Sequence, residues 1–263
     1  MPIVRRLLAL WIVASLPALA EESLQRGDFD QAIKYLDTYL TFNADSAKIH
    51  LMLSWACLKK GDRARALEES TEAIRLDPTN PDAYGQRAAC YAARADYVEA
   101  IRDCCEALQL APDHAATLRQ QAYLYHETKQ YAETLVDYEA LLRLDPKDAN
   151  TRLQLVDLLA TCPDRTVRDL ARAEKEADRL DPQAHTSHRP YATLAALRAG
   201  RGELSQAIAW QRKALACADH LDKEEKSKAA LVLKLYQTRK KKADKAAPRR
   251  TERKPPPPRG DGQ

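Results

Sequence analysis

The sequence predicts an all-α protein, and three observations support that prediction. Its 263 residues include only seven each of Gly, Val and Ile, and 6% are aromatic. Sheets favour β-branched and aromatic residues and their turns favour Gly, so the composition argues against a β-sandwich or β-barrel. Ala and Leu dominate the apolar residues, and both are strong helix formers. Finally, a short phrase returns at a constant interval through the middle of the chain.

A proline closes each copy of that phrase. Pro78, Pro112 and Pro146 are evenly spaced, and Pro182 follows after a slightly longer interval. Leu-Asp or Leu-Ala precedes each of these prolines. Self-similarity at a fixed period of about 34 residues indicates a stack of helical repeats, and proline ends the helices because it lacks the N–H that would continue them.

Small residues return at matched places within each copy. When the proline is counted as position 32, positions 8, 20 and 27 hold Ala in most copies, with exceptions that include Ser54, Thr134 and Val156. Two closely crossing antiparallel helices leave no room there for larger side chains. This pattern strongly resembles the tetratricopeptide repeat family of the bacterial multi-repeat type, over about residues 27–238. The resemblance implies an α-solenoid, a superhelix of about five to six antiparallel helix pairs with a C-terminal capping helix.

The N-terminus predicts an export signal. Arg5 and Arg6 form a positive start, an apolar run extends over residues 7–16, and residues 18–20 read Ala-Leu-Ala, which is a small-x-small cleavage site. The apolar run is shorter than the ~20 residues that cross a bilayer. Cleavage would leave a truncated first helix beginning at Glu21.

An alternative is that residues 13–26 form a helix of the folded body. The repeat register, continued backwards, places Leu16, Leu19 and Ala20 at packing positions of a first repeat. Pro17 speaks against this interpretation, because proline inside a helix costs about 3 kcal/mol.

Local signals at helix ends agree with the repeats. Asn80, Pro81 and Asp82 supply an N-cap, a proline at the first helical position and an acid near the helix dipole. Asp96 and Glu99 have the spacing of a capping box.

The last third departs from the regular pattern. Residues 159–164 resemble a phrase of bacterial multi-repeat proteins, which predicts that Cys162 lies in a helix-terminating turn rather than in a reactive centre. Near the end of the repeats, Leu231, Leu235 and Tyr236 have the spacing to cover the last open face of the stack.

These signals divide the chain into nine segments. In order they are a signal peptide at 1–20, a partial first repeat at 21–46, full repeats at 47–80, 81–114 and 115–148, an atypical repeat at 149–187, a further repeat at 188–221, a capping helix at 222–238, and a basic, Pro-rich, disordered tail at 239–263.

Charge is concentrated at the two ends of the chain. The net charge of +4 divides into +7 for residues 239–263, +2 for residues 1–20 and −5 for the body between them. The tail has too few apolar residues to fold. It is a candidate for contact with an anionic polymer such as nucleic acid, or with anionic lipid, weakening as salt rises. The alternative is a solvated tail without a partner.

No catalytic pattern is present in the sequence. It has no Gly-rich phosphate loop, no Gly-x-Ser-x-Gly and no His-Glu-x-x-His, so we expect no enzyme activity, no cofactor, no metal and no small-molecule substrate. An even number of cysteines in an exported protein permits disulfides, but buried free thiols are the favoured interpretation. The cysteines are Cys57, Cys90, Cys104, Cys105, Cys162 and Cys217.

The resemblance also implies a binding groove. In this family, positions 2, 5, 9 and 12 of each first helix line a concave face where peptides bind. The candidate partner-binding residues are Lys48, Trp55, Gln86, Arg119, Tyr123, His126, Asn150 and Asp157.

Between Trp55 and Tyr123 the groove wall is nearly bare, because it carries Gly85, Ala89 and Ala92. Aromatic anchors beside such a wall suit an extended segment of a partner. The alternative is that both aromatic rings pack against neighbouring helices. The Lys/Asn/Arg pattern that clamps chaperone C-terminal carboxylates is absent, since Trp55 and Gln86 stand at its asparagine positions.

The sequence therefore predicts a non-enzymatic scaffold or adaptor that binds a peptide or partner protein in its groove and is exported to the periplasm or cell envelope. The alternative is an intracellular adaptor whose basic tail docks on nucleic acid or an anionic membrane surface.

Overall fold

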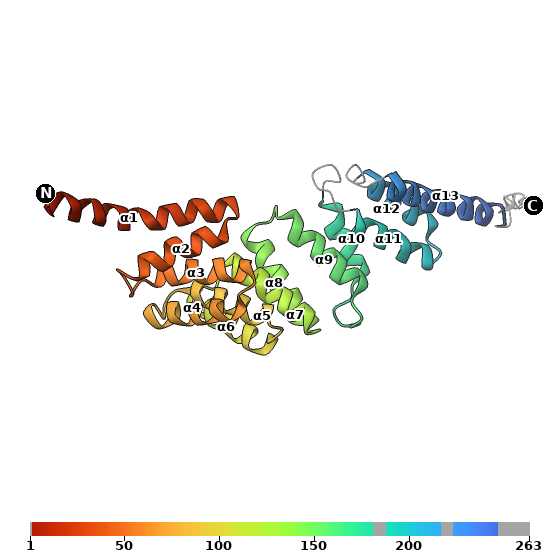
Figure 1. Cartoon of the computed structure of the whole chain (residues 1–263). Helices are drawn as coiled ribbons and strands as arrows, with labels where there is room; N and C mark the ends of the chain where they lie inside the picture. Colours follow the sequence, from red (N-terminus) through yellow and green to blue (C-terminus); the bar gives the residue numbers. More distant parts are fainter. Residues whose placement is uncertain (1, 181–187, 217–222, 247–263) are drawn as a thin grey trace, which may run out of the picture. The chain divides into compact units, whose positions relative to one another are not determined.

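The structure is a computed structural model that describes residues 2–180, 188–216 and 223–246. Every regular element in these ranges is a helix, which confirms the predicted all-α class (Figure 1). None of the described helices combines the length and hydropathy that a membrane span needs. The helices are α1 (Pro2–Arg26), α2 (Phe29–Leu40), α3 (Ala47–Lys60), α4 (Arg63–Leu76), α5 (Pro81–Ala93), α6 (Tyr97–Leu110), α7 (Ala115–Glu127), α8 (Tyr131–Leu144), α9 (Ala149–Thr161), α10 (Leu170–Asp178), α11 (Arg189–Gly200), α12 (Leu204–Ala216) and α13 (Lys223–Ala246).

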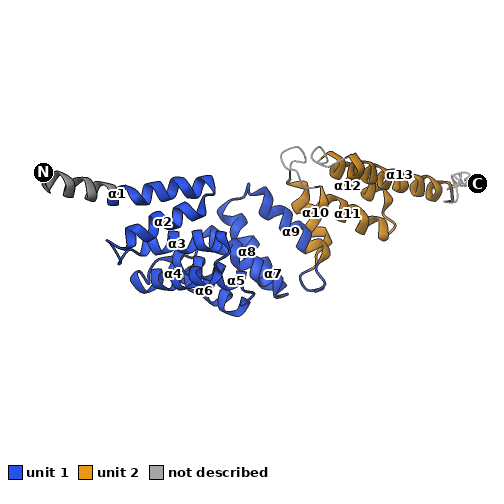
Figure 2. Ribbon diagram, in the orientation of Figure 1, with its two compact units in different colours: residues 1–158, 162–167 blue, residues 159–161, 168–263 orange. Residues whose placement is uncertain are grey.

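The chain divides into two compact units (Figure 2). Unit 1 comprises residues 1–158 and 162–167, and unit 2 comprises residues 159–161 and 168–263. In unit 1 the helices pack as consecutive pairs, α1 with α2, α3 with α4, α5 with α6 and α7 with α8, and each pair packs on the next. In unit 2, α11 pairs with α12 and α13 packs on α12. The consecutive helix pairs confirm the solenoid architecture.

The small residues of the repeat pattern lie where paired helices meet. In α3 and α4, Ser54 and Ala66 are fully buried, and the Ser54 hydroxyl donates to the Ala66 carbonyl oxygen over 2.7 Å. In α5 and α6, Ala88 and Ala100 are fully buried in one cluster. The small residues that recur with the repeat period therefore lie where the backbones of two paired helices approach most closely.

The buried cysteines contribute to packing. Cys57 and Cys90 belong to the core that joins α1 to α5, and Cys104 belongs to the core between α5, α6 and α7. Cys57, Cys90, Cys104 and Cys105 carry free thiols, and Cys217 lies outside the described residues. Burial raises the pKa of Cys57 to about 11 and that of Cys104 to about 12, so both stay protonated at neutral pH.

The helix ends follow the predicted signals with one exception. Asn80 caps α5 by accepting a hydrogen bond from the Asp82 amide over 3.0 Å, with Pro81 in the first turn. The predicted capping box of Asp96 and Glu99 is wrong. The Asp96 amide donates to the Tyr91 carbonyl oxygen instead, and its carboxylate pairs with Arg94 at 3.0 Å. The amide that Glu99 would bind is therefore already satisfied.

Helix α1 continues through the predicted cleavage site after Ala20. Leu16 and Ala20 are buried, and Ala20 packs in one core cluster with Ile33 and Leu36 of α2. Pro17 lies inside the helix. This is the placement expected if residues 13–26 belong to the folded body, and removal of residues 1–20 stays a prediction.

The C-terminal part of the described chain shows how the regular repeats end. Cys162 is the C-cap of α9 and is buried, as expected for a helix-terminating turn. On α13, Tyr236 is buried while Leu231 and Leu235 are exposed, so only one of the three predicted covering side chains is buried. Helix α13 also runs past the predicted boundary at Thr238 to Ala246, because no helix breaker precedes Pro248. Residues 247–263 of the predicted tail lie outside the described residues.

A candidate peptide-binding cavity

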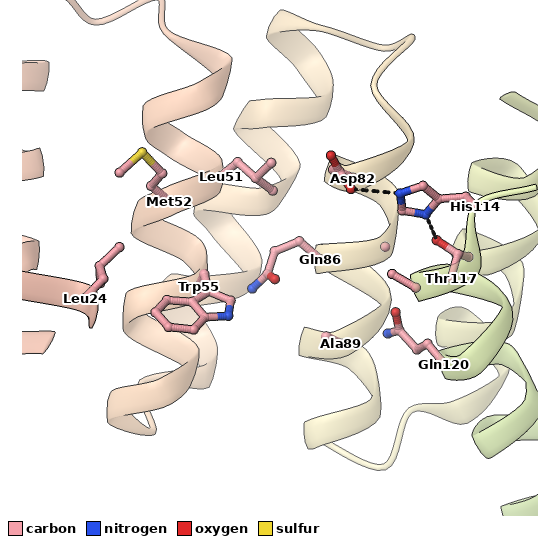
Figure 3. A pocket seen from close by; sticks show the side chains of 12 residues that line it. Leu24, Leu51, Met52, Trp55, Asp82, Gln86, Ala89, His114, Thr117 and Gln120 are labelled. Carbon is pink, nitrogen blue, oxygen red and sulfur yellow. Dashed lines mark hydrogen bonds and ion pairs between the residues drawn. The ribbon is translucent and has the colours of Figure 1, made fainter. Parts of the chain in front are cut away.

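A cavity of about 380 Å³ opens in unit 1 along α3, α5 and α7, with one side chain from α1 (Figure 3). Most of its lining residues are apolar or small, and they come mainly from one face of each helix. The lining residues are Leu24, Leu51, Met52, Trp55, Asp82, Gly85, Gln86, Ala89, His114, Ala116, Thr117 and Gln120.

Helical periodicity brings these side chains together. On α5, Asp82, Gly85, Gln86 and Ala89 are spaced by three or four positions, so they form one stripe along the helix. The neighbouring helices contribute their stripes at the same register, since positions 52, 86 and 120 are equivalent places in three successive repeats.

Trp55 lines the cavity while resting against a neighbouring helix. Its ring meets the edge of the Phe29 ring with centroids 5.8 Å apart, and the Lys59 ammonium lies 5.5 Å from its centroid. It is nevertheless 37% exposed. The ring therefore contacts a neighbouring helix and also lines the cavity, and its role as an anchor for a partner stays a prediction.

Gly85 leaves the middle of the cavity wall bare. A Cβ added at this residue would meet the Thr117 hydroxyl at 3.4 Å, which is an ordinary contact, and its backbone has no left-handed φ. Neither backbone conformation nor packing thus requires glycine here. Next to it, the Gln86 side-chain amide donates to the Ser54 hydroxyl over 3.3 Å, which holds Gln86 at the cavity edge.

A hydrogen-bonded group closes the other end of the cavity. His114 Nδ1 lies 2.8 Å from the Thr117 hydroxyl, and His114 Nε2 lies 3.2 Å from Asp82 Oδ1 (Figure 3). The cavity thus has an aromatic end at Trp55, a bare centre at Gly85 and a polar end at His114.

The cavity includes two of the eight candidate groove residues, Trp55 and Gln86. Lys48 pairs instead with Glu21 at 3.1 Å, and Arg119 pairs with Asp148 at 3.2 Å.

The remaining four candidates lie outside the cavity. Tyr123 is 53% exposed, and the charge of Glu127 raises the pKa of its phenol. His126 meets the edge of the Tyr131 ring at 5.8 Å. Asn150 is exposed on α9, and Asp157 on the same helix is partly buried.

Sequence reasoning missed several lining residues, among them Leu24, Met52, His114 and Gln120. The period itself signals two of them, because Met52 and Gln120 stand one repeat before and one repeat after Gln86. Leu24 and His114 carry no such signal. Leu24 lies on α1, and His114 is the N-cap residue that precedes α7. Among the described residues, no cluster of three His, Cys, Asp or Glu side chains is placed to hold a metal ion.

Comparison with known proteins agrees with the repeat pattern over part of the chain. Two family models, each described as tetratricopeptide repeat, match residues 18–81 and 71–102. No curated protein matches the chain.

Several solved structures share the fold. The pilF protein of Pseudomonas aeruginosa superposes with a TM-score of 0.64 at 20% identity, covering 86% of this chain and 97% of that one. MamA from Desulfovibrio magneticus RS-1, from residue 41 to its end, gives 0.55 at 17% identity, covering 64% and 92%. A chain of the Naa15/Naa10 complex bound to HypK-THB gives 0.53 at 18% identity, covering 89% of this chain and 35% of that one. At these identities the likeness is one of fold.

Proposed function

Because this chain is a tetratricopeptide repeat protein, we propose that it is a non-enzymatic adaptor that binds an extended segment of a partner protein in the cavity along α3, α5 and α7. The observation that carries the proposal is the glycine in the middle of the cavity wall. Gly85 weakens α5 by about 1 kcal/mol relative to alanine, although a Cβ would fit there. The space that a side chain would fill at Gly85 is left open to the cavity, where an extended segment would lie.

The lining also indicates what kind of segment fits. Trp55 offers an apolar, partly fixed ring on which an apolar or aromatic side chain of the partner can stack. Gln86 and Gln120 offer side-chain amides that can hydrogen-bond an extended backbone, which has an unpaired donor and acceptor at every residue. Asp82 and His114 provide a polar limit at the far end.

A peptide selection on the whole chain tests this proposal. Peptides selected from a random library would be titrated with wild-type, Trp55→Ala and Gly85→Leu proteins by calorimetry. We expect each variant to weaken binding about 30-fold, which is about 2 kcal/mol, through loss of the anchor or filling of the cavity.

The matched control is Val98→Ala, which removes an exposed apolar side chain of α6 outside the cavity. Melting curves separate binding from folding, because leucine is a better helix former than glycine and the Gly85→Leu protein should melt no lower than wild type. Unchanged affinity in both cavity variants, or selection of no peptide at all, would contradict the proposal.

We further propose that the protein is exported to the periplasm or cell envelope of a bacterium. The support is the order of features at the N-terminus, where a positive start, an apolar run and a small-x-small site follow one another. Since Leu16 and Ala20 are buried against the rest of unit 1, processing after Ala20 would expose part of that core and lower its stability.

N-terminal sequencing of the purified protein distinguishes export from the intracellular alternative. We expect the mature chain to begin at Glu21. A retained Met1 would contradict export and favour an intracellular adaptor, whose basic residues 239–263 would then be candidates for contact with nucleic acid or an anionic membrane.

A further inference from the structure

A second cavity of unit 1, of about 420 Å³, lies between α6, α7 and α8. It shares no lining residue with the first cavity. Its mouth is formed by exposed side chains, including Gln109, Glu133 and Val136. The lining residues are Cys105, Leu108, Gln109, Gln121, Tyr125, Glu133, Val136 and Asp137.

Asp137 is the unusual member of this lining. Asp137 is only 6% exposed. Its Oδ2 has no hydrogen-bond partner among the described residues. A buried carboxylate normally has a paired charge or several donors, because an unpaired one costs much of its hydration energy. Asp137 thus lines the cavity with a buried carboxylate whose Oδ2 has no donor among the described residues.

The preceding repeat shows which donor suits this place. Asp103 stands one repeat before Asp137, and Arg87 stands one repeat before Gln121. The Arg87 guanidinium makes a bidentate pair with Asp103, with N–O distances of 2.7 and 2.8 Å. Gln121 carries no charge, and its side-chain amide donates to the Cys105 sulfur over 3.3 Å.

The neighbours of Asp137 add no positive charge. Cys104 and Cys105 face it from α6, Tyr125 faces it from α7, and Glu133 and Tyr138 lie on its own helix. All of these groups are neutral or negative. Burial, assisted by Glu133, raises the pKa of Asp137 to about 7.

We propose that the cavity between α6, α7 and α8 binds the guanidinium group of an arginine side chain from a partner protein, which pairs with Asp137 as Arg87 pairs with Asp103. The planar guanidinium has two parallel N–H donors for one carboxylate, and a guanidinium is more weakly hydrated than an ammonium. Glu133 at the mouth adds attraction for the same charge. This site is independent of the peptide cavity along α3, α5 and α7.

The proposal is tested on the full chain at pH 8, where Asp137 is ionised, with Nα-acetyl-arginine methylamide as the probe. Backbone amide shifts measured by NMR should move saturably in α6, α7 and α8. The lysine analogue should bind several-fold more weakly, and the neutral citrulline analogue should not bind. Equal binding of arginine and citrulline, equal binding of arginine and lysine, or no shift at all would overturn the proposal.

Two variants link the binding to Asp137. Asp137→Asn should weaken the probe at least about tenfold, since a charged acceptor becomes a neutral one. Glu106→Gln removes an exposed charge of α6 outside the cavity and should leave binding unchanged. Gln121→Arg should supply the missing arginine from within the chain, exclude the probe and raise the melting temperature. Binding that survives either Asp137→Asn or Gln121→Arg would contradict the assignment.

Discussion

Glu69, Asp103 and Asp137 occupy the same place in three successive repeats, and each has a different set of neighbours. Glu69 lies 2.7 Å from His50 Nδ1 and also pairs with Arg65, whereas Asp103 pairs with Arg87. Asp137 has no such partner on Oδ2 within the described part of the chain. The repeat thus keeps an acid at one place while the group that balances it changes.

The raised pKa of Asp137 predicts how stability varies with pH. Its folded-state pKa of about 7 lies above the value of about 4 expected in the unfolded chain, so between these values the folded state holds a proton that the unfolded state has lost. This group therefore lowers the stability of the wild-type protein as pH rises from about 4 to about 7. Asp137→Asn should be more stable than wild type by about 1–3 kcal/mol at pH 8, with a smaller difference near pH 4.

Urea unfolding at both pH values measures that difference. Asp113→Asn is the control, because Asp113 is exposed and its replacement should change stability by less than about 0.5 kcal/mol. A gain at Asp137→Asn that is the same at pH 4 and pH 8 would show that ionisation of this carboxyl is not its cause.

The turns between paired helices follow the repeat rather than the residue type. Gly61, Ala95 and Lys129 stand at equivalent places in successive repeats, and all three have a left-handed φ, of 95°, 64° and 62°. For Ala95 and Lys129 this conformation costs about 1–2 kcal/mol each, which the packing of the helices on either side must offset. The turn is therefore predictable from the period, although Ala95 and Lys129 lack the glycine that Gly27 and Gly61 supply at the same place.

Helix α13 packs on α12 at the end of the described array. Tyr236 is buried there, and the Gln211 side chain of α12 donates to the Ala229 carbonyl oxygen over 3.0 Å. Tyr236→Ala should destabilise unit 2 by about 2–4 kcal/mol, because a large buried ring leaves a cavity. The measurement is helical circular dichroism during urea unfolding.

Leu235→Ala is the matched control for that experiment. Leu235 neighbours Tyr236 on α13 but is 54% exposed, so its loss should change stability by less than about 0.5 kcal/mol. Comparable losses from the two variants would mean that α13 does not pack on α12 through Tyr236.

Across the whole molecule, the net charge is determined by the two basic ends of the chain and not by the repeats between them. The net charge of +4 conceals a body of −5 between two basic ends, so the overall sign says nothing about the surface of the repeats. Several ion pairs of that body join neighbouring helices. Two of the candidate groove residues form such pairs within unit 1. Lys48 pairs with Glu21, and Arg119 pairs with Asp148.

The amino-acid sequence was sufficient to predict the all-α class, the helix pairs and the small residues between them. These features depend on period, helix propensity and proline, which act within one repeat or between adjacent helices and therefore leave a regular trace in the chain. It also placed Trp55, Gln86 and the bare wall at Gly85 on one face.

Packing in three dimensions decided the rest. It brought Leu24 and His114 to the first cavity, paired Lys48 and Arg119 elsewhere, and left Asp137 beside a cavity without the arginine that its counterpart Asp103 has. The repeat period predicts which face of a helix a residue occupies. The neighbour that pairs with its charge or hydrogen-bonding groups comes from another helix. The distance and direction of that neighbour are set by the packing of the helices and cannot be read from the sequence.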